Sequence, residues 1–220
     1  MTAIAAKICG LNTPASVKTA VDNGAAYVGA VFYPKSPRSV TPQQAADLFG
    51  DLPAAVKLVG LFVDPDDNLL RTVVDHVKLD LIQLHGSEPP ERVAHIRKTY
   101  GIPVMKALAI ETPDDLSRAK AYETVSDMLL FDAKAPKSMK DALPGGNGLS
   151  FDWTMLATEQ FTTPWMLAGG LTADNVQEAV RISGATSVDT SSGVESKPGE
   201  KDPAAIVRFL KAVRHIKIEG

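Results

Sequence analysis

The chain has 220 residues, of which 45% are hydrophobic and 22% charged, a composition typical of a globular protein with a sizeable core. Its formal net charge of −3, without any basic block, argues against a nucleic-acid or anionic-membrane partner. One cysteine excludes an internal disulfide, and the lack of a secretory signal or a membrane-length apolar run predicts a cytoplasmic protein.

Short apolar segments alternate along the chain with amphipathic segments of helical periodicity. We expect strands at residues 4–8, 27–32, 56–62, 80–84, 103–108, 127–131, 164–168 and 186–189. We expect helices at residues 13–23, 41–49, 66–76, 89–99, 112–121, 172–183 and 202–213, with a short further candidate at 153–158. Because no linker separates these segments, residues 1–220 are predicted to form a single domain.

Strands that alternate with helices predict a parallel sheet, and this number of units favours an α/β fold, a (β/α)8 TIM barrel. The alternative is an open doubly wound sheet, but no Gly-x-Gly-x-x-Gly motif follows the first strand. Active sites of TIM barrels lie at the carboxyl ends of the strands. The polar or glycine residues at or near these ends are Cys9, Arg38, Gln83, His85, Lys106, Asp132, Gly169, Gly170, Asp189, Thr190, Ser191, Ser192 and Gly193.

The first predicted strand leads into Cys9, the only cysteine of the chain. Because strand residues two apart share a face, Lys7 and Cys9 point in the same direction. A nearby ammonium group would lower the pKa of the thiol and make it a usable base or nucleophile. The alternative is that Cys9 is a small core hydrophobe, the commoner role of a lone cysteine.

Asp132 follows the apolar residues 128–131 directly, at the point where a strand reaches the mouth of the predicted barrel. Partial desolvation there would favour the protonated carboxyl that a general acid requires. The alternatives are a helix N-cap or an ion pair with Lys134. Cys9 and Asp132 are therefore a candidate base and acid on the first and sixth strands.

Glycine-containing turns follow the seventh and eighth strands, at Gly169-Gly170 and Ser192-Gly193. Many TIM barrels bind phosphate at these two loops through backbone N–H groups. Glycine allows the backbone to approach the anion, although it also occurs in ordinary turns. Phosphate binding is predicted because both loops carry the feature.

Two further side chains could bind substrate. Arg38 could hold a carboxylate with two hydrogen bonds, or be an ordinary solvated loop residue. His85 could donate to a substrate oxygen, whereas the other histidines (His76, His95 and His215) are expected on helix surfaces. The four histidines have no metal-ligand spacing, so we predict no metal. The glycine-rich loop at residues 145–148 is either a lid or plain surface.

Taken together, short motifs along nearly the whole chain resemble those of the phosphoribosylanthranilate isomerase family. They are Lys7-Ile8-Cys9-Gly10, Ser36-Pro37-Arg38, Gln83-Leu84-His85-Gly86, Leu130-Phe131-Asp132, Gly145-Gly146-Asn147-Gly148, Phe151-Asp152-Trp153, Leu167-Ala168-Gly169-Gly170-Leu171, Ser191-Ser192-Gly193-Val194-Glu195, Pro198-Gly199 and Lys201-Asp202. The resemblance implies a (β/α)8 barrel and an Amadori rearrangement in tryptophan biosynthesis, without metal or cofactor. The substrate would be N-(5-phosphoribosyl)anthranilate, and the product 1-(2-carboxyphenylamino)-1-deoxyribulose 5-phosphate.

The resemblance also assigns roles. Asp132 would protonate the furanose ring oxygen, and Cys9, as a thiolate, would remove the C2 proton. Arg38 would hold the anthranilate carboxylate and Asp189 a hydroxyl or the amine. Backbone amides around Gly169, Gly170, Ser192 and Gly193 would hold the phosphate.

We expect Lys7 to help keep Cys9 ionised, and Gly146 and Asn147 to supply a loop contact. The chain departs from the family pattern at Asn147, Leu149 and Thr190, which affects the contacts of the loop rather than the reaction.

The residues speak against three alternatives. The Amadori isomerase of histidine biosynthesis uses an aspartate where this chain has Cys9. A metal-dependent sugar-phosphate epimerase needs histidines and aspartates clustered at strand ends. A non-catalytic sugar-phosphate-binding barrel would have no reason to hold both Cys9 and Asp132. A monomeric enzyme is the prediction.

Overall fold

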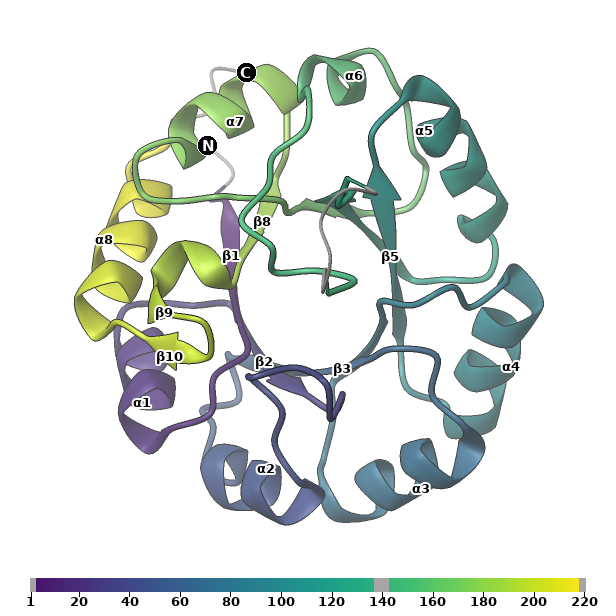
Figure 1. Cartoon of the computed structure of the whole chain (residues 1–220), viewed down its shortest axis with the longest axis vertical. Helices are drawn as coiled ribbons and strands as arrows, with labels where there is room; N and C mark the ends of the chain where they lie inside the picture. Colours follow the sequence, from purple (N-terminus) through teal and green to yellow (C-terminus); the bar gives the residue numbers. More distant parts are fainter. Residues whose placement is uncertain (1–2, 137–142, 218–220) are drawn as a thin grey trace.

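The computed structural model describes residues 3–136 and 143–217, and its centre is a closed barrel of parallel strands in the order β1 to β8. A helix follows each strand and packs on the outside of the barrel (Figure 1). The predicted (β/α)8 TIM barrel is therefore confirmed, and the open doubly wound alternative is wrong.

Each barrel strand overlaps its predicted segment. The strands are β1 (Ala5–Cys9), β2 (Tyr27–Val31), β3 (Lys57–Phe62), β4 (Leu81–Leu84), β5 (Val104–Ile110), β6 (Met128–Ala133), β7 (Trp165–Leu167) and β8 (Ser187–Thr190). The helices are α1 (Pro14–Asp22), α2 (Pro42–Phe49), α3 (Asp67–His76), α4 (Pro90–Tyr100), α5 (Pro113–Ala119), α6 (Thr154–Ala157), α7 (Val176–Ser183) and α8 (Pro203–Arg214). None of the described helices is long and apolar enough to cross a membrane.

Local sequence explains where α1 and α2 begin. Thr13 and Thr41 each cap a helix by accepting a hydrogen bond from the backbone N–H three residues on, at 3.2 Å in both cases. A proline follows each threonine at the first helical position, where its missing N–H costs nothing. Each Thr-Pro pair therefore fixes the residue at which its helix begins.

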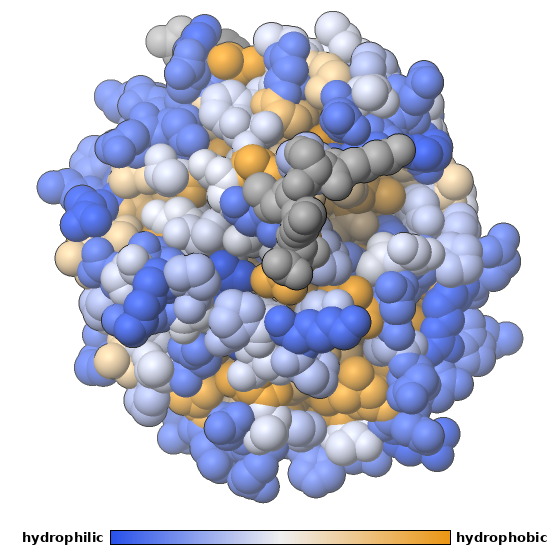
Figure 2. Space-filling model, in the orientation of Figure 1, coloured by the Kyte–Doolittle hydropathy of each residue, from blue (hydrophilic) through white to orange (hydrophobic). Residues whose placement is uncertain are grey.

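The strands separate two apolar cores because alternate side chains point to opposite faces. Inside the barrel lie Val59, Leu81, Met105, Ala107, Leu130, Met166 and Ala168. A larger layer between the strands and the helices includes Phe62, Leu70, Ile96 and Phe209. In the space-filling view hydrophilic side chains dominate the periphery, as expected when helices turn their apolar faces to the barrel (Figure 2).

The structure differs from the predicted elements near the site. Helix α7 begins at Val176 rather than near Thr172, because residues 172–175 form a turn in which Thr172 N donates to Asn175 Oδ1 at 2.8 Å. After β8 come a short 3-10 helix, η2 (Ser192–Val194), and a hairpin of β9 (Glu195–Lys197) and β10 (Glu200–Lys201), which was not predicted.

Lys106 is not at the mouth of the barrel, contrary to the expectation. It alternates with the barrel-lining Met105 and Ala107, so its side chain lies on the outer face of β5. There Lys106 Nζ donates to Glu88 Oε2 at 2.6 Å and to the Gly86 carbonyl at 2.7 Å. This buried ion pair fixes the loop that follows β4.

Candidate active site

The carboxyl ends of the strands surround a hollow of about 470 Å³ that opens to solvent. Its lining includes Cys9, Arg38, His85, Asp132 and Asp189, all predicted from the sequence as site residues. Lys7 lies deeper in the barrel and is fully buried. His76, His95 and His215 are exposed, as predicted, and take no part.

Cys9 is the last residue of β1 and is only 4% exposed. Its neighbour on β2 is Gly29, where a Cβ atom would lie 3.1 Å from the sulfur, so the glycine makes room for the thiol. Burial raises the pKa of the Cys9 thiol, and the positive charges of Lys7 and Lys201 only partly oppose this. The expectation of a lowered thiol pKa is therefore wrong, because desolvation outweighs the nearby ammonium groups.

Lys7 shares the face of Cys9, as predicted, and its Nζ donates to Asp189 Oδ1 at 2.9 Å. Burial acts to lower the pKa of Lys7, but the Asp189 carboxylate and Cys9 outweigh it and raise that pKa. Lys7 therefore stays charged inside the barrel. One oxygen of Asp189 is occupied by this contact.

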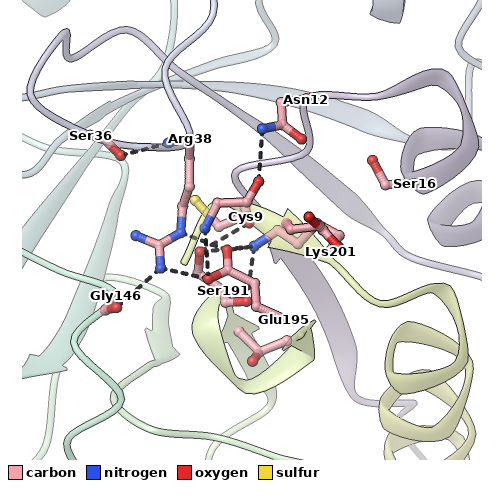
Figure 3. Close-up of polar contacts among 12 residues, drawn as sticks. Cys9, Asn12, Ser16, Ser36, Arg38, Gly146, Ser191, Glu195 and Lys201 are labelled. Carbon is pink, nitrogen blue, oxygen red and sulfur yellow. Dashed lines mark hydrogen bonds and ion pairs between the residues drawn. The ribbon is translucent and has the colours of Figure 1, made fainter. Parts of the chain in front are cut away.

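Arg38 is held by a residue that the sequence reasoning did not select. Its Nε and Nη2 donate to the two carboxylate oxygens of Glu195, at 2.7 and 2.9 Å, and Nη2 also donates to the Gly146 carbonyl at 3.2 Å (Figure 3). Arg38 is 5% exposed. The guanidinium is thus neither a solvated loop residue nor wholly free for a substrate carboxylate.

Glu195 also binds Lys201, whose Nζ donates to Glu195 Oε1 at 2.7 Å and to the Ser191 carbonyl at 2.9 Å. Ser191 Oγ in turn donates to the Cys9 carbonyl at 3.1 Å. Burial acts to raise the pKa of Glu195, but Arg38 and Lys201 outweigh it and hold that pKa below its ordinary value. This network ties the β9–β10 hairpin to the loop after β8 and to the end of β1 (Figure 3).

Asp132 lies near the end of β6, where its Oδ1 accepts a hydrogen bond from Ala133 N at 2.8 Å. Its Oδ2 is 3.3 Å from His85 Nε2. Lys134 instead pairs with Glu111 and Asp115, so the alternatives of an ion pair with Lys134 and of a helix N-cap are both wrong. Asp132 faces the pocket.

A second hollow of about 300 Å³ adjoins the first at the loops after β7 and β8. It is lined by Asp132, Gly146, Asn147, Gly148, Ala168, Gly169, Gly170, Leu171, Asp189, Thr190, Ser191, Ser192 and Gly193. A Cβ atom at Gly193 would overlap the Leu171 carbonyl oxygen, so only glycine fits there. The two predicted phosphate loops do lie side by side.

The loop residues Gly146 and Asn147 also lie at this second hollow. The Asn147 side chain closes its own loop, because Nδ2 donates to the Leu143 carbonyl at 2.7 Å and Oδ1 accepts from Leu143 N at 3.1 Å. Within residues 3–136 and 143–217, no group of three or more His, Cys, Asp or Glu side chains could hold a metal ion.

Comparisons with known proteins agree with this arrangement. A family model for N-(5'-phosphoribosyl)anthranilate isomerase matches residues 6–212. The N-(5'-phosphoribosyl)anthranilate isomerase of Rhodospirillum centenum is 59% identical over 204 residues, 93% of this chain and 95% of that protein. The structure of phosphoribosyl anthranilate isomerase from Thermotoga maritima has a TM-score of 0.85 at 35% identity, over 96% of this chain and 98% of that one.

A further structure of a phosphoribosyl anthranilate isomerase holds reduced 1-(o-carboxyphenylamino)-1-deoxyribulose 5-phosphate. It has a TM-score of 0.82 and 33% identity to this chain, over 96% of this chain and 98% of that one. The similarity covers the barrel as a whole.

Proposed function

The chain belongs to the N-(5'-phosphoribosyl)anthranilate isomerase family, and we propose that it isomerises N-(5-phosphoribosyl)anthranilate to 1-(2-carboxyphenylamino)-1-deoxyribulose 5-phosphate by an Amadori rearrangement. The observation that carries the mechanism is that Cys9 and Asp132, from strands β1 and β6, line one pocket. The substrate's carboxylate, hydroxyl and phosphate groups each have a candidate partner around that pocket.

Asp132 is the general acid of the first step. Its proton passes to the furanose ring oxygen, the bond from C1 to that oxygen breaks, and the nitrogen lone pair forms a C=N bond. Cys9, as a thiolate, then removes the C2 proton, and the C2–H electron pair forms the enolamine double bond. The enolamine tautomerises to the ketone. Both residues act by proton transfer, which side chains perform without a cofactor.

Burial raises the pKa of the Cys9 thiol, so the thiolate that the second step needs is disfavoured in the free enzyme. Ring opening creates a positive charge on the substrate nitrogen. That charge joins those of Lys7 and Lys201 and favours the thiolate at the step that needs it, and the thiol proton leaves to solvent through the open pocket.

The remaining polar groups bind the substrate. We assign Arg38 to the anthranilate carboxylate through the N–H groups that Glu195 does not use, and Asp189 to a hydroxyl or the amine through the oxygen that Lys7 leaves. Backbone N–H groups at Gly169, Gly170, Ser192 and Gly193 are assigned to the phosphate. The two hollows adjoin each other, which supports placing the anthranilate end of the substrate in the first and its phosphate in the second.

The test follows the loss of fluorescence of freshly generated phosphoribosylanthranilate. Cys9→Ser and Asp132→Asn are each expected to slow turnover about 100- to 10,000-fold, because each removes one proton transfer. Asp75→Asn on the exposed surface of α3 is the control and should match the wild type. Equal activity in wild type, Cys9→Ser and Asp132→Asn would contradict the assignment of these residues.

We also propose that the enzyme acts as a cytoplasmic monomer in tryptophan biosynthesis. Among the described residues, Val207 is the large hydrophobic side chain that is exposed, at 37%, so the surface offers little apolar area for association. Light scattering after size exclusion should give a mass near 23.4 kDa. Twice that mass would contradict the monomer.

A further inference from the structure

A line of three side chains runs from the barrel interior to the carboxyl group of Asp132. Gln83 on β4 is fully buried, and its Nε2 is 2.9 Å from His85 Nδ1. His85 Nε2 is in turn 3.3 Å from Asp132 Oδ2. Gln83 and His85 point to the same side because His85 directly follows β4 and is two residues from Gln83 along the same extended segment.

The structure orients the Gln83 amide with its NH2 group toward His85 Nδ1, and in this orientation the amide donates, Nδ1 accepts and the ring proton lies on Nε2. Protonation of Nδ1 would place two N–H groups against each other. The Gln83 Oε1 atom has no hydrogen-bond partner among the described residues. The hydrogen bond that this buried amide makes is therefore the one from Nε2 to His85. Its barrel-lining neighbours Leu81 and Met105 are apolar, and packing alone would be served by another such residue.

The charged groups near His85 are already paired. Lys7 binds Asp189, Arg38 binds Glu195, and Lys106 binds Glu88. Besides Asp132, the titratable groups that share the pocket with His85 are Cys9, Tyr33, Arg38 and Asp189. If His85 were protonated, its ring would therefore be an unpaired cation next to Asp132. A carboxyl group beside a cation gives up its proton more readily.

We propose that Gln83 is a positioning residue for the isomerase reaction, which holds His85 as the neutral Nε2–H form and so lets Asp132 keep the proton that it donates. This inference rests on the proposed role of Asp132 as general acid. Gln83 itself does not contact the substrate.

The first test needs no variant. In protein labelled with ¹⁵N-histidine, nitrogen chemical shifts distinguish the two neutral forms of the ring from the charged form, and loss of a signal in His85→Asn assigns His85. At neutral pH we expect the nitrogen shifts of His85 to be those of the neutral Nε2–H form. A charged His85 at that pH, or an Nδ1–H form, would overturn the proposal.

The second test uses Gln83→Glu, which has the same shape but whose carboxylate accepts a hydrogen bond from a protonated Nδ1. We expect the His85 ring to become charged in this variant. The rate is then compared in a Cys9→Ser background, where Asp132 is the remaining acid–base group, and the fall in rate with rising pH should move to lower pH by about one unit. Gln83→Met, which removes the amide, should release the His85 ring from the single Nε2–H form in the nitrogen spectrum. Gln177→Glu on the exposed face of α7 should change nothing.

An unchanged pH profile in a folded Gln83→Glu protein with a charged His85 would overturn the proposal. If Gln83→Glu does not fold, the nitrogen shifts of His85 in the wild type and in Gln83→Met still decide it. Failure of the proposed function has a different signature, because Asp132→Asn would then retain full activity whatever the state of His85.

Discussion

Cys9 and Asp132 lie in one pocket but in different electrostatic surroundings. On the Cys9 side, Lys7, Arg38 and Lys201 are each paired with a buried carboxylate. On the Asp132 side, the contacts are a backbone N–H and the imidazole of His85. A base that works as an anion is stabilised by nearby cations, whereas an acid keeps its proton best without one. The barrel thus places cations beside Cys9, where they partly offset the effect of burial, and, among the described residues, none beside Asp132.

The largest expected change on the Cys9 side comes from Glu195→Gln, which leaves Arg38 and Lys201 without their shared carboxylate. We expect the free energy of unfolding to fall by about 3 kcal/mol, because buried charges lose their partner. Denaturant titration measures it. Asp22→Asn, which breaks the exposed Lys18–Asp22 pair, is the control and should have almost no effect.

The same contact predicts a dependence on pH. Since the pKa of Glu195 is lowered in the folded state, its stabilisation is fully present above the ordinary value of 4.5 and is lost as pH falls through the lowered value. Between about pH 5 and pH 3, the free energy of unfolding of the wild type should therefore fall by more than that of Glu195→Gln. If both proteins lost the same free energy of unfolding, Arg38 and Lys201 would not be stabilising the ionised form of Glu195.

On the Asp132 side the sharpest change is Gly145→Ala. A Cβ atom there would lie 2.7 Å from the His85 ring and 2.8 Å from Asp132 Oδ2, so one of these groups must move. We expect turnover to fall about 10- to 100-fold, the usual effect of misplacing a catalytic group. The rate of Cys9 alkylation should stay unchanged in Gly145→Ala. If turnover and the alkylation rate fell together, the surroundings of Cys9 and Asp132 would not be independent.

A smaller change is expected from Lys7→Met, which removes one cation from beside Cys9 and leaves the Asp189 carboxylate unpaired. Both effects should raise the pKa of the thiol further, so the midpoint of alkylation against pH should rise by about one unit. Lys18→Met on the exposed surface of α1 is the control. An unchanged midpoint in Lys7→Met would mean that Lys7 does not act on Cys9.

The barrel and most of its mouth could be predicted from the sequence because strand alternation and glycine turns are local signals. Glu195 and Lys201 lie in motifs that resemble the family's, but their ion pairs with Arg38 and with each other could not be predicted. These pairs form only because the β9–β10 hairpin folds back on a residue far away in the chain. The outward direction of Lys106 could have been predicted, because it alternates with the apolar Met105 and Ala107. The direction of the Cys9 pKa could not, because it depends on how completely the closed barrel excludes water.

The most direct test of the acid–base pair is kcat as a function of pH for the wild type, Cys9→Ser and Asp132→Asn. The active form needs a deprotonated Cys9 and a protonated Asp132, so the wild-type rate should rise with pH at the acidic end and fall at the alkaline end. Cys9→Ser should lose the rise, and Asp132→Asn should lose the fall. If both limbs persist in both variants, other groups carry the protons and the assignment of Cys9 and Asp132 is wrong.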